Sequence, residues 1–429
     1  MKIKILQQSL SLLFATLLPK LVFFLLNVFL ARYLSVQNYG QYALVRSTIN
    51  MLDNSISSSM YPLVIKEVSS SSQEEKQKVV SNVFFIILIF FLIVCFFLYL
   101  NASKISLYLI GEVNPDIIIV SIFLLFFTIL NGYLTSILVS YEKLKIITRI
   151  SLISASLTCI LIFLIWTIGG DVSITIGLSI LLFFAFIDSI SKFLYLFRMK
   201  ALMVFKSFCI WFDISFVARF VLASIPMILA SFVNAWVFWF IRKLESVTEG
   251  GFEIVAYFDV SFQYILISML FLNSLSTIIL SKMSSLSSVN KNNKYPSGNY
   301  LFIAFSFSFA ISIVSIIIIH MFSTYLMQLF GTGYDAEHLD LLSFVLIFYG
   351  FALIFNRMCV SLGKNWILLI VSLISGIGMI FYYTKNRELN QLAIFDSFIA
   401  YYLVSCLVFI FFAIYYYYRG DNEKALRNI

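Results

Sequence analysis

The amino-acid sequence predicts an all-α integral membrane protein with about twelve transmembrane helices in two six-helix lobes. Three observations predict this class. Of the 429 residues, 61% are hydrophobic and 12% are charged, which is about half the charged fraction of a soluble domain. The apolar residues fall in stretches of about 20 residues, the length that crosses a bilayer. Positive charge alternates between successive connecting segments, as it does when a chain crosses a membrane repeatedly.

The apolar stretches define the expected spans. In the first half of the chain they cover residues 9–31, 39–64, 79–100, 116–140, 150–168 and 172–197. In the second half they cover residues 217–241, 254–280, 298–322, 339–362, 365–383 and 393–418. The N-terminal stretch is too long for a signal-peptide core and does not end in a small-residue cleavage site. We therefore expect it to be retained as the first span.

The basic residues of the connecting segments predict the orientation in the membrane. Most of the 29 Lys and Arg residues lie in the two termini and in every second connection, for example Lys78, Arg149 and Lys294. The remaining connections hold few basic residues, such as Arg32 and Lys104. Cytoplasmic loops carry the excess of Lys and Arg. Both termini are therefore expected in the cytoplasm.

The two halves of the chain resemble repeats. Pro19 precedes Asn27 in the first span, and Pro226 precedes Asn234 in the seventh span at the same spacing. Six spans in each half with the same inward start predict a parallel repeat, with a binding site between the halves. Each proline leaves one helical carbonyl unpaired, which permits bending. Pro19 and Pro226 are therefore the expected hinges.

The domain boundaries follow from this repeat. The N-terminal lobe is expected at residues 1–200 and the C-terminal lobe at residues 217–429. Residues 201–216 place phenylalanines on one helical face and charged residues on another. This pattern predicts a linker helix that lies on the cytoplasmic surface of the membrane.

The first two spans contain polar residues that lipid would exclude. Lys20 lies near the middle of the first span, and Arg46, Asn50 and Asp53 share one face of the second. A cation at membrane depth costs about 3 kcal/mol or more if it meets hydrocarbon. These side chains are therefore expected to face a polar cavity between helices. The alternative is that they satisfy one another inside the bundle, with Arg46 paired to Asp53 or to a residue of a neighbouring helix.

Other spans also carry charged or polar residues. Asp188 and Lys192 are four residues apart, and we expect them to form a local ion pair. Arg357 lies close enough to the cytoplasmic end of its span to reach the interface. His320 is expected to be interfacial rather than a proton relay. The eighth span repeats the polar stripe with Asp259, Gln263, Asn273 and Thr277. The carboxylates considered for ion coupling are Asp53, Asp188 and Asp259.

Composition and motif spacing exclude several functional classes. The five cysteines are scattered and the two histidines stand far from them, so neither a disulfide framework nor a metal site is expected. No basic run with interleaved aromatic residues predicts a nucleic-acid partner. The expected external connections have roughly a dozen residues at most, too few for a folded catalytic domain. An enzyme is therefore not expected, and neither is a cofactor.

Three segments resemble a known superfamily. They are the run ARYLSVQNYGQYALV at residues 31–45, the FGTGYDAE turn at residues 330–337, and the turn at residues 363–365. They resemble the polysaccharide-transport branch of the multidrug/oligosaccharidyl-lipid/polysaccharide exporter superfamily. The chain looks most like an O-antigen or capsule repeat-unit flippase of the Wzx type over nearly its full length. Ser35 and Val36 stand where members often have Gly and Pro; the sequence departs from the family pattern at this turn, and the overall assignment is little affected.

The resemblance implies a function and its partners. It implies alternating-access flipping of an oligosaccharide carried on undecaprenyl pyrophosphate, for O-antigen of lipopolysaccharide or for capsule. The transport would cross the bacterial cytoplasmic (inner) membrane through a cationic cavity between two lobes, while the polyprenyl tail stays among membrane lipids. A polysaccharide polymerase and a chain-length regulator are the expected protein partners.

The charges read from the sequence agree with this implication. A pyrophosphate is anionic and needs fixed cations or a wet cavity at membrane depth. Side-chain amides offer donors and acceptors to sugar hydroxyls. The expected substrate-binding residues are Lys20, Asn27, Arg46, Asn50, Asn234, Gln263 and Arg357.

Three rival functions share features with this interpretation. A drug or cation antiporter of the same superfamily would need a buried acid in the first span, where the only charge is Lys20. A membrane polysaccharide polymerase or ligase would need catalytic residues in a large external loop. A lipid II flippase usually carries two further spans. The sequence therefore favours the flippase of oligosaccharide repeat units.

Overall fold

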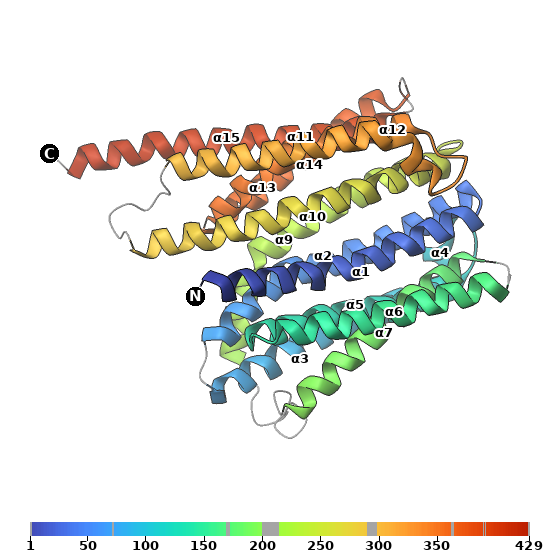
Figure 1. Ribbon diagram of the computed structural model, residues 1–429, viewed down its shortest axis with the longest axis horizontal. Helices are drawn as coiled ribbons and strands as arrows, with labels where there is room; N and C mark the ends of the chain where they lie inside the picture. The colour runs from blue at the N-terminus through green and yellow to red at the C-terminus, as the bar shows by residue number, and fades with distance from the viewer. Residues whose placement is uncertain are drawn as a thin grey trace. The chain divides into compact units, whose positions relative to one another are not determined.

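The structure of the chain is a computed structural model. It describes residues 2–70, 73–168, 172–199, 214–289, 298–361, 364–388, 390 and 392–427. In these ranges all regular secondary structure is helical, which confirms the predicted all-α class (Figure 1). Of the cytoplasmic linker helix predicted at residues 201–216, residues 201–213 lie outside the described residues, and residues 214–216 belong to helix α9 (Ile214–Ser246).

The helices follow one another along the chain with short connections. The first eight are α1 (Lys2–Tyr33), α2 (Val36–Ser70), α3 (Gln73–Leu100), α4 (Ala102–Ile110), α5 (Pro115–Ser140), α6 (Leu144–Ile168), α7 (Ile174–Arg198) and α9 (Ile214–Ser246). The remaining helices are α10 (Gly251–Val289), α11 (Gly298–Gln328), α12 (Ala336–Ser343), α13 (Val345–Ser361), α14 (Asn365–Asn386) and α15 (Ala393–Arg427).

Each apolar stretch predicted to span the membrane lies on a helix. The tenth stretch is divided between α12 and α13, which follow each other directly. Within the described residues, 10 helices are long and apolar enough to cross a membrane by length and composition. The first two predicted spans, α1 and α2, are not among the 10, although they have 32 and 35 residues. The protein is a multi-pass membrane protein, and its orientation stays a prediction.

The chain divides into two compact units, Met1–Ala256 and Tyr257–Ile429. In the first unit α5 packs against α2 and α7, α1 packs against α6, and α2 packs against α9. In the second unit α14 packs against α15, and α11 packs against α12 and α13. The division falls within α10, whereas the predicted lobe boundary precedes α9. The two six-helix lobes therefore stay a prediction.

Local sequence signals explain several helix ends. Pro115 begins α5, where its missing N–H costs nothing because the first helical N–H groups have no intrahelical partner. Ser173 precedes α7, and its side chain accepts a hydrogen bond from the backbone N–H of Ile176. Gly111 ends α4 with φ of 79°, in the left-handed region that glycine adopts at low cost.

Large side chains fill the interior of each unit separately. In the first unit Tyr39, Tyr42 and Tyr133 are fully buried. The Tyr133 hydroxyl donates to the carbonyl of Val80, 2.6 Å away, so its polar end is satisfied. In the second unit the fully buried set includes Phe258, Phe330, Phe395, Phe398 and Tyr383. Aromatic residues therefore supply much of the packing on both sides of the division.

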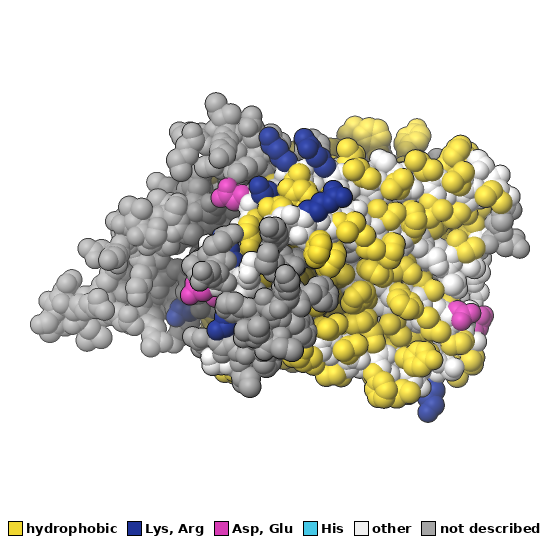
Figure 2. Space-filling model, turned by 90° about the horizontal axis from the view of Figure 1, so that it is seen from below, with side chains coloured by type: hydrophobic (Ala, Val, Ile, Leu, Met, Phe, Trp, Pro, Cys, Tyr) yellow, Lys and Arg dark blue, Asp and Glu magenta, His cyan; other side chains and the backbone are white. Residues whose placement is uncertain are grey.

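Hydrophobic side chains also cover much of the described surface. Phe96 and Phe97 near the end of α3 are 68% and 63% exposed. In Figure 2 most of the described surface in view is hydrophobic, and Lys and Arg side chains gather toward one end. A surface of this kind suits a chain surrounded by lipid, with charges placed where the helices leave the membrane.

Candidate functional site

The first cation predicted at membrane depth, Lys20, lies in α1 directly after Pro19. Its side chain is exposed. It makes no hydrogen bond or ion pair with any residue that the structure describes. Val22 and Leu26 on the same helix are only 4% and 0% exposed. Helix α1 therefore packs against the protein with a face other than the one that carries Lys20. The expected alternative of a structural ion pair therefore does not apply to Lys20 within the described residues.

Arg46 on α2 is held by a residue of α1. Its Nη1 donates to Oδ1 of Asn27 across 2.5 Å. The guanidinium carbon also lies 5.6 Å from the centre of the Tyr42 ring, a cation–π distance. The Tyr42 hydroxyl reaches the same Asn27 oxygen at 3.5 Å. Asn27 and Tyr42 together therefore fix the position of a half-buried guanidinium.

Asn27 itself is almost fully buried, at 1% exposure. Its Nδ2 group has no hydrogen-bond partner among the described residues. A buried amide donor without a partner costs about 1–3 kcal/mol. The side chain nevertheless keeps this orientation, in which its oxygen faces Arg46. Asn27 lies beneath the guanidinium rather than on an accessible surface.

The polar stripe of α2 continues beyond Arg46. Asn50 is exposed and Asp53 is half-buried. Asp53 makes no ion pair with Arg46 in the described part of the chain, and its Oδ1 is buried without a hydrogen-bond partner. Of the two forms of the predicted alternative, the Arg46–Asp53 pair is therefore wrong, whereas a bond from Arg46 to a neighbouring helix is present in the contact with Asn27 on α1. The two charges on this stripe stay separate.

The proposed hinge of the seventh span, Pro226, lies within α9 and is buried. Asn234 on the same helix is half-buried. Further along α9, Nε1 of Trp239 donates to Oγ1 of Thr48 on α2, 2.8 Å away. The helices that carry Arg46 and Asn234 are therefore in direct side-chain contact within the first unit.

The predicted ion pair between Asp188 and Lys192 is confirmed. The Lys192 Nζ lies 2.5 Å from Oδ2 of Asp188, and the two side chains are 3% and 1% exposed. Lys192 also donates to Asn131 at 2.6 Å and to Thr135 at 3.0 Å, both on α5. The hydroxyl of Ser151 on α6 donates to Asp188 Oδ1 at 3.4 Å. This satisfied cluster ties α5, α6 and α7 together.

The second unit contains its own buried carboxyl group, Asp259 on α10, which is 2% exposed. Nε2 of Gln263 donates to its Oδ2 across 3.2 Å. In the loop before α12, burial raises the pKa of the Tyr334 phenol, and the charges of Asp259 and Tyr257 raise it further. Gln263 therefore donates to the carboxyl group of Asp259 in the structure, whereas the sequence predicts that it binds a sugar.

The last expected cation, Arg357 on α13, is half-buried. It interacts electrostatically with Tyr349 on the same helix. The Tyr349 hydroxyl accepts a hydrogen bond of 2.7 Å from Nδ2 of Asn273 on α10. Asn273 belongs to the predicted stripe of the eighth span, and Thr277 of that stripe has no described side-chain environment.

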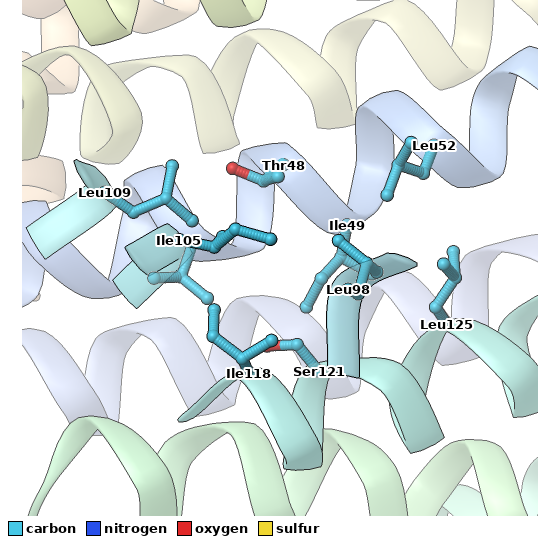
Figure 3. Close-up of a pocket in the computed structure, with 10 residues that line it drawn as sticks. Thr48, Ile49, Leu52, Leu98, Ile105, Leu109, Ile118, Ser121 and Leu125 are labelled. Carbon is cyan, nitrogen blue, oxygen red and sulfur yellow. The ribbon is translucent and has the colours of Figure 1, made fainter. Parts of the chain in front are cut away.

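An apolar pocket lies between α2, α3, α4 and α5 (Figure 3). Its volume is about 30 Å³, well below the roughly 150 Å³ of a protein cavity that binds benzene. The two hydroxyls in its wall are already bonded, Thr48 to the carbonyl of Leu44 and Ser121 to that of Ile117. The pocket is therefore too small and too apolar to bind a sugar.

Several partners of these residues do not follow from the sequence pattern. Tyr42 stands out in the sequence only as part of a motif, and the roles of Asn131 and Thr135 are not predicted at all. The spacing of Asn131 and Thr135, four residues apart on one helix face, is a signal that could mark a polar contact inside the bundle. The link from Tyr349 to Asn273 has no counterpart in the sequence pattern.

Comparison with known proteins places the chain in a family. The sequence profile of the family described as polysaccharide biosynthesis protein matches residues 5–285. The chain belongs to this family. The predicted resemblance to the polysaccharide-transport branch is thereby confirmed. No curated protein sequence matches the chain.

Solved structures share the fold of this family member at low sequence identity. An inward-facing multidrug resistance transporter of the MATE family, in the MOP superfamily, matches with a TM-score of 0.72 and 12% identity over 94% of this chain and 95% of its own. The lipid II flippase MurJ in an inward closed conformation matches with a TM-score of 0.69 and 18% identity over 93% and 86%. A superfamily transporter from Pyrococcus furiosus, described as having reversed polarity of its binding pocket, matches with a TM-score of 0.70 and 13% identity over 98% and 96%. The fold is therefore that of transporters, as the sequence predicted.

Proposed function

We propose that the protein is a flippase for oligosaccharide repeat units linked to undecaprenyl pyrophosphate. It moves them across the bacterial cytoplasmic membrane by alternating access, for the synthesis of O-antigen or capsule. The family supports a role in polysaccharide synthesis, and the fold supports transport. The substrate is the lipid-linked precursor, and its polyprenyl tail remains among membrane lipids.

The observation that carries this proposal is the accessible positive charge of Lys20 on α1. Lys20 is exposed and makes no ion pair with a described residue. An ammonium at membrane depth that is not neutralised by the protein attracts an anionic headgroup. Pyrophosphate is such a group, whereas an organic cation would be repelled.

Arg46 provides a second cation in the same unit. Its guanidinium is half-buried and oriented by Asn27 and Tyr42. Arginine presents several N–H donors in a planar arrangement that matches phosphate oxygens. In this proposal Arg46 binds pyrophosphate or an acidic sugar, and Asn27 positions Arg46 instead of touching the glycan. Asn50, which is exposed on the same stripe, is the amide that contacts sugar hydroxyls.

The assignments outside these two helices remain parts of the proposal. Asn234 and Arg357 complete the set of half-buried substrate ligands. Pro19 and Pro226 act as hinges. A polysaccharide polymerase and a chain-length regulator receive the flipped unit.

One observation favours a second candidate function, a cation antiporter of the same superfamily. Oδ1 of Asp53 is buried and has no hydrogen-bond partner among the described residues. A carboxyl group in that state is available to bind a proton or a small cation. The same feature also fits the flippase, in which Asp53 would couple transport to an ion.

Purified protein in liposomes distinguishes the two functions. A fluorescent oligosaccharide on polyprenyl pyrophosphate is placed in both leaflets, and the fraction protected from an external glycosidase is followed with time. The flippase predicts loss of protection in protein-containing vesicles only. A fluorescent organic cation is tested in parallel vesicles. Transport of the cation without movement of the lipid-linked sugar would reject the proposal and favour the antiporter.

A further inference from the structure

The end of the short helix α4 is fastened by side chains from two other helices of the first unit. The last carbonyls of a helix have no intrahelical partner. In α4, the carbonyl of Ile110 accepts a hydrogen bond of 2.9 Å from Nε2 of Gln41 on α2. Nζ of Lys243 on α9 donates to the carbonyl of Tyr108 at 2.5 Å. The C-terminal turn of α4 is thus bonded to both α2 and α9.

Lys243 is suited to this contact by its charge. A helix C-terminus carries partial negative charge, which stabilises a nearby cation. The ammonium also lies 4.5 Å from the centre of the Tyr108 ring. Lys243 is only 6% exposed, and it forms no ion pair with an acidic residue in the described part of the chain. Its buried charge is therefore balanced mainly by the end of α4.

The same region of α2 packs tightly against α9 and the start of α10. A Cβ atom at Gly40 would lie 1.9 Å from the carbonyl oxygen of Phe252, so only glycine fits there. One face of α2 continues from Gly40 to Ser47, which is buried at 6% exposure. The bond from Trp239 to Thr48 lies beside it. Figure 1 shows α4 at the same end of the first unit as the turn between α1 and α2.

This end of the helices is the one that the charge pattern predicts to face outward. Alternating access requires helices to separate on one side of the membrane and then on the other. The contacts between α2 and α9 hold these two helices together at that end. Opening that side by movement of α9 must break the bond between Lys243 and α4.

We propose that Lys243 is a latch that holds the outer ends of α2, α4 and α9 closed, by donating its ammonium to the C-terminal carbonyls of α4. The latch sets how often the outer side opens. It rests on the proposed alternating-access transport, but it can be tested without any substrate.

The test measures how accessible the contact between α2 and α9 is to a water-soluble reagent. Ser47→Cys is introduced on the face of α2 that follows Gly40, and intact cells are treated with a membrane-impermeant maleimide. The chain without Ser47→Cys reports the labelling of the five native cysteines. We expect slow labelling of Ser47→Cys alone. Adding Lys243→Gln should raise the labelling rate roughly tenfold, the change that corresponds to about 1.4 kcal/mol.

Two further variants control this result. Lys243→Arg keeps the charge and should label nearly as slowly as the parent. Lys104→Gln removes a lysine from the same α4 helix whose side chain is exposed, and it should leave the rate unchanged. An unchanged rate in Lys243→Gln, or an equal increase in Lys104→Gln, would overturn the latch.

Protein yield is measured for each variant so that poor insertion is not mistaken for opening. If Lys243→Gln does not insert, Gln41→Ala removes the other side-chain bond to α4 and should raise labelling severalfold. No increase in Gln41→Ala would then reject the latch. Because labelling needs no lipid-linked sugar, a normal increase together with absent flipping would retain the latch and reject the proposed substrate.

Discussion

Nη1 of Arg46 and Oδ1 of Asn27 are 2.5 Å apart, which joins a half-buried cation on α2 to a buried amide on α1. Hydrogen bonds that involve a charged group contribute about 1.5–3 kcal/mol. Asn27 also orients the guanidinium, because its oxygen accepts from Arg46 on one side and lies 3.5 Å from the Tyr42 hydroxyl on the other. The position of Arg46 therefore depends on a residue that no substrate needs to touch.

Replacing Asn27 tests whether orientation of Arg46 matters for transport. Asn27→Ala removes the acceptor and should lower the initial flipping rate roughly tenfold, as expected for the loss of one such bond. Asn27→Asp adds a negative charge next to Arg46 and should lower the rate further, because it competes with an anionic substrate. Asn386→Ala at the exposed end of α14 is the matched control. Normal flipping by Asn27→Ala, measured in liposomes, would separate Arg46 from the substrate site.

The cluster around Asp188 and Lys192 predicts an effect on stability. Breaking a buried ion pair by removing one partner costs about 3–5 kcal/mol because the other charge is stranded. Lys192→Met should therefore lower the melting temperature of the detergent-solubilised protein and its yield. Removing both charges with Asp188→Asn and Lys192→Met should recover part of that loss. Lys145→Met, at an exposed position near the start of α6, is the control.

This result would also decide whether Asp188 couples transport to an ion. The carboxylate already accepts from Lys192 and Ser151 in the structure. If the double variant is well folded and still flips at the normal rate, Asp188 has a structural role only. A folded double variant that has lost ion dependence would assign it to coupling instead.

How far the fold can be predicted from the sequence depends on the length of each apolar run. Long apolar runs mark each spanning helix because about 20 apolar residues have few other uses. The nine-residue helix α4 is too short to give such a signal, and the sequence does not predict it. The end of α9 is predicted too early, since Arg242 and Lys243 resemble loop residues. Both are buried within α9, at 9% and 6% exposure.

For the candidate site, contacts within one helix can be predicted from the sequence, whereas contacts between helices cannot. The pair of Asp188 and Lys192 is predictable because residues four apart share a helix face. For Arg46 the sequence leaves a partner on a neighbouring helix open but does not identify it, and the contact found is with Asn27 on α1. Helix packing brings such residues together, and the packing of polar side chains leaves little trace in hydrophobic periodicity.

The hinge role of Pro226 can be tested by restoring the helical hydrogen bond. Pro226→Ala supplies an N–H group and should straighten α9, so transport should slow while insertion stays normal. Pro115→Ala is a suitable control because Pro115 begins α5, where the N–H has no helical partner. If Pro226→Ala and Pro19→Ala both flip substrate at the normal rate, bending at these prolines is not part of the mechanism.

The predicted orientation can be checked with reporter fusions. Fusions after Lys78, Arg149 and Lys294 should report the cytoplasm, because these connections carry the excess of positive charge. Fusions near Lys104 and Thr332 should report the outer side. Two or more inverted reports would show that the number of spans differs from the prediction, and they would also move the Lys243 latch to the other side of the membrane.

The charge of Lys20 gives the most direct test of the substrate class. Lys20 is exposed and has no ion-pair partner among the described residues, so its removal strands no buried carboxylate there. Lys20→Arg should therefore keep much of the flipping activity, Lys20→Met should lose most of it, and Lys20→Glu should abolish it. The expected order follows from attraction of pyrophosphate to a cation and its repulsion by a carboxylate.

The measurement for this series is surface polysaccharide divided by the amount of folded transporter in the membrane. All three variants should reach the membrane in similar amounts, since each change is at an exposed position. A fall in protein level that accounts for the loss of polysaccharide would indicate a structural role. If Lys20→Met shows normal yield and normal export, Lys20 does not bind the headgroup, and Arg46 would have to carry the attraction of an anionic substrate in the first unit.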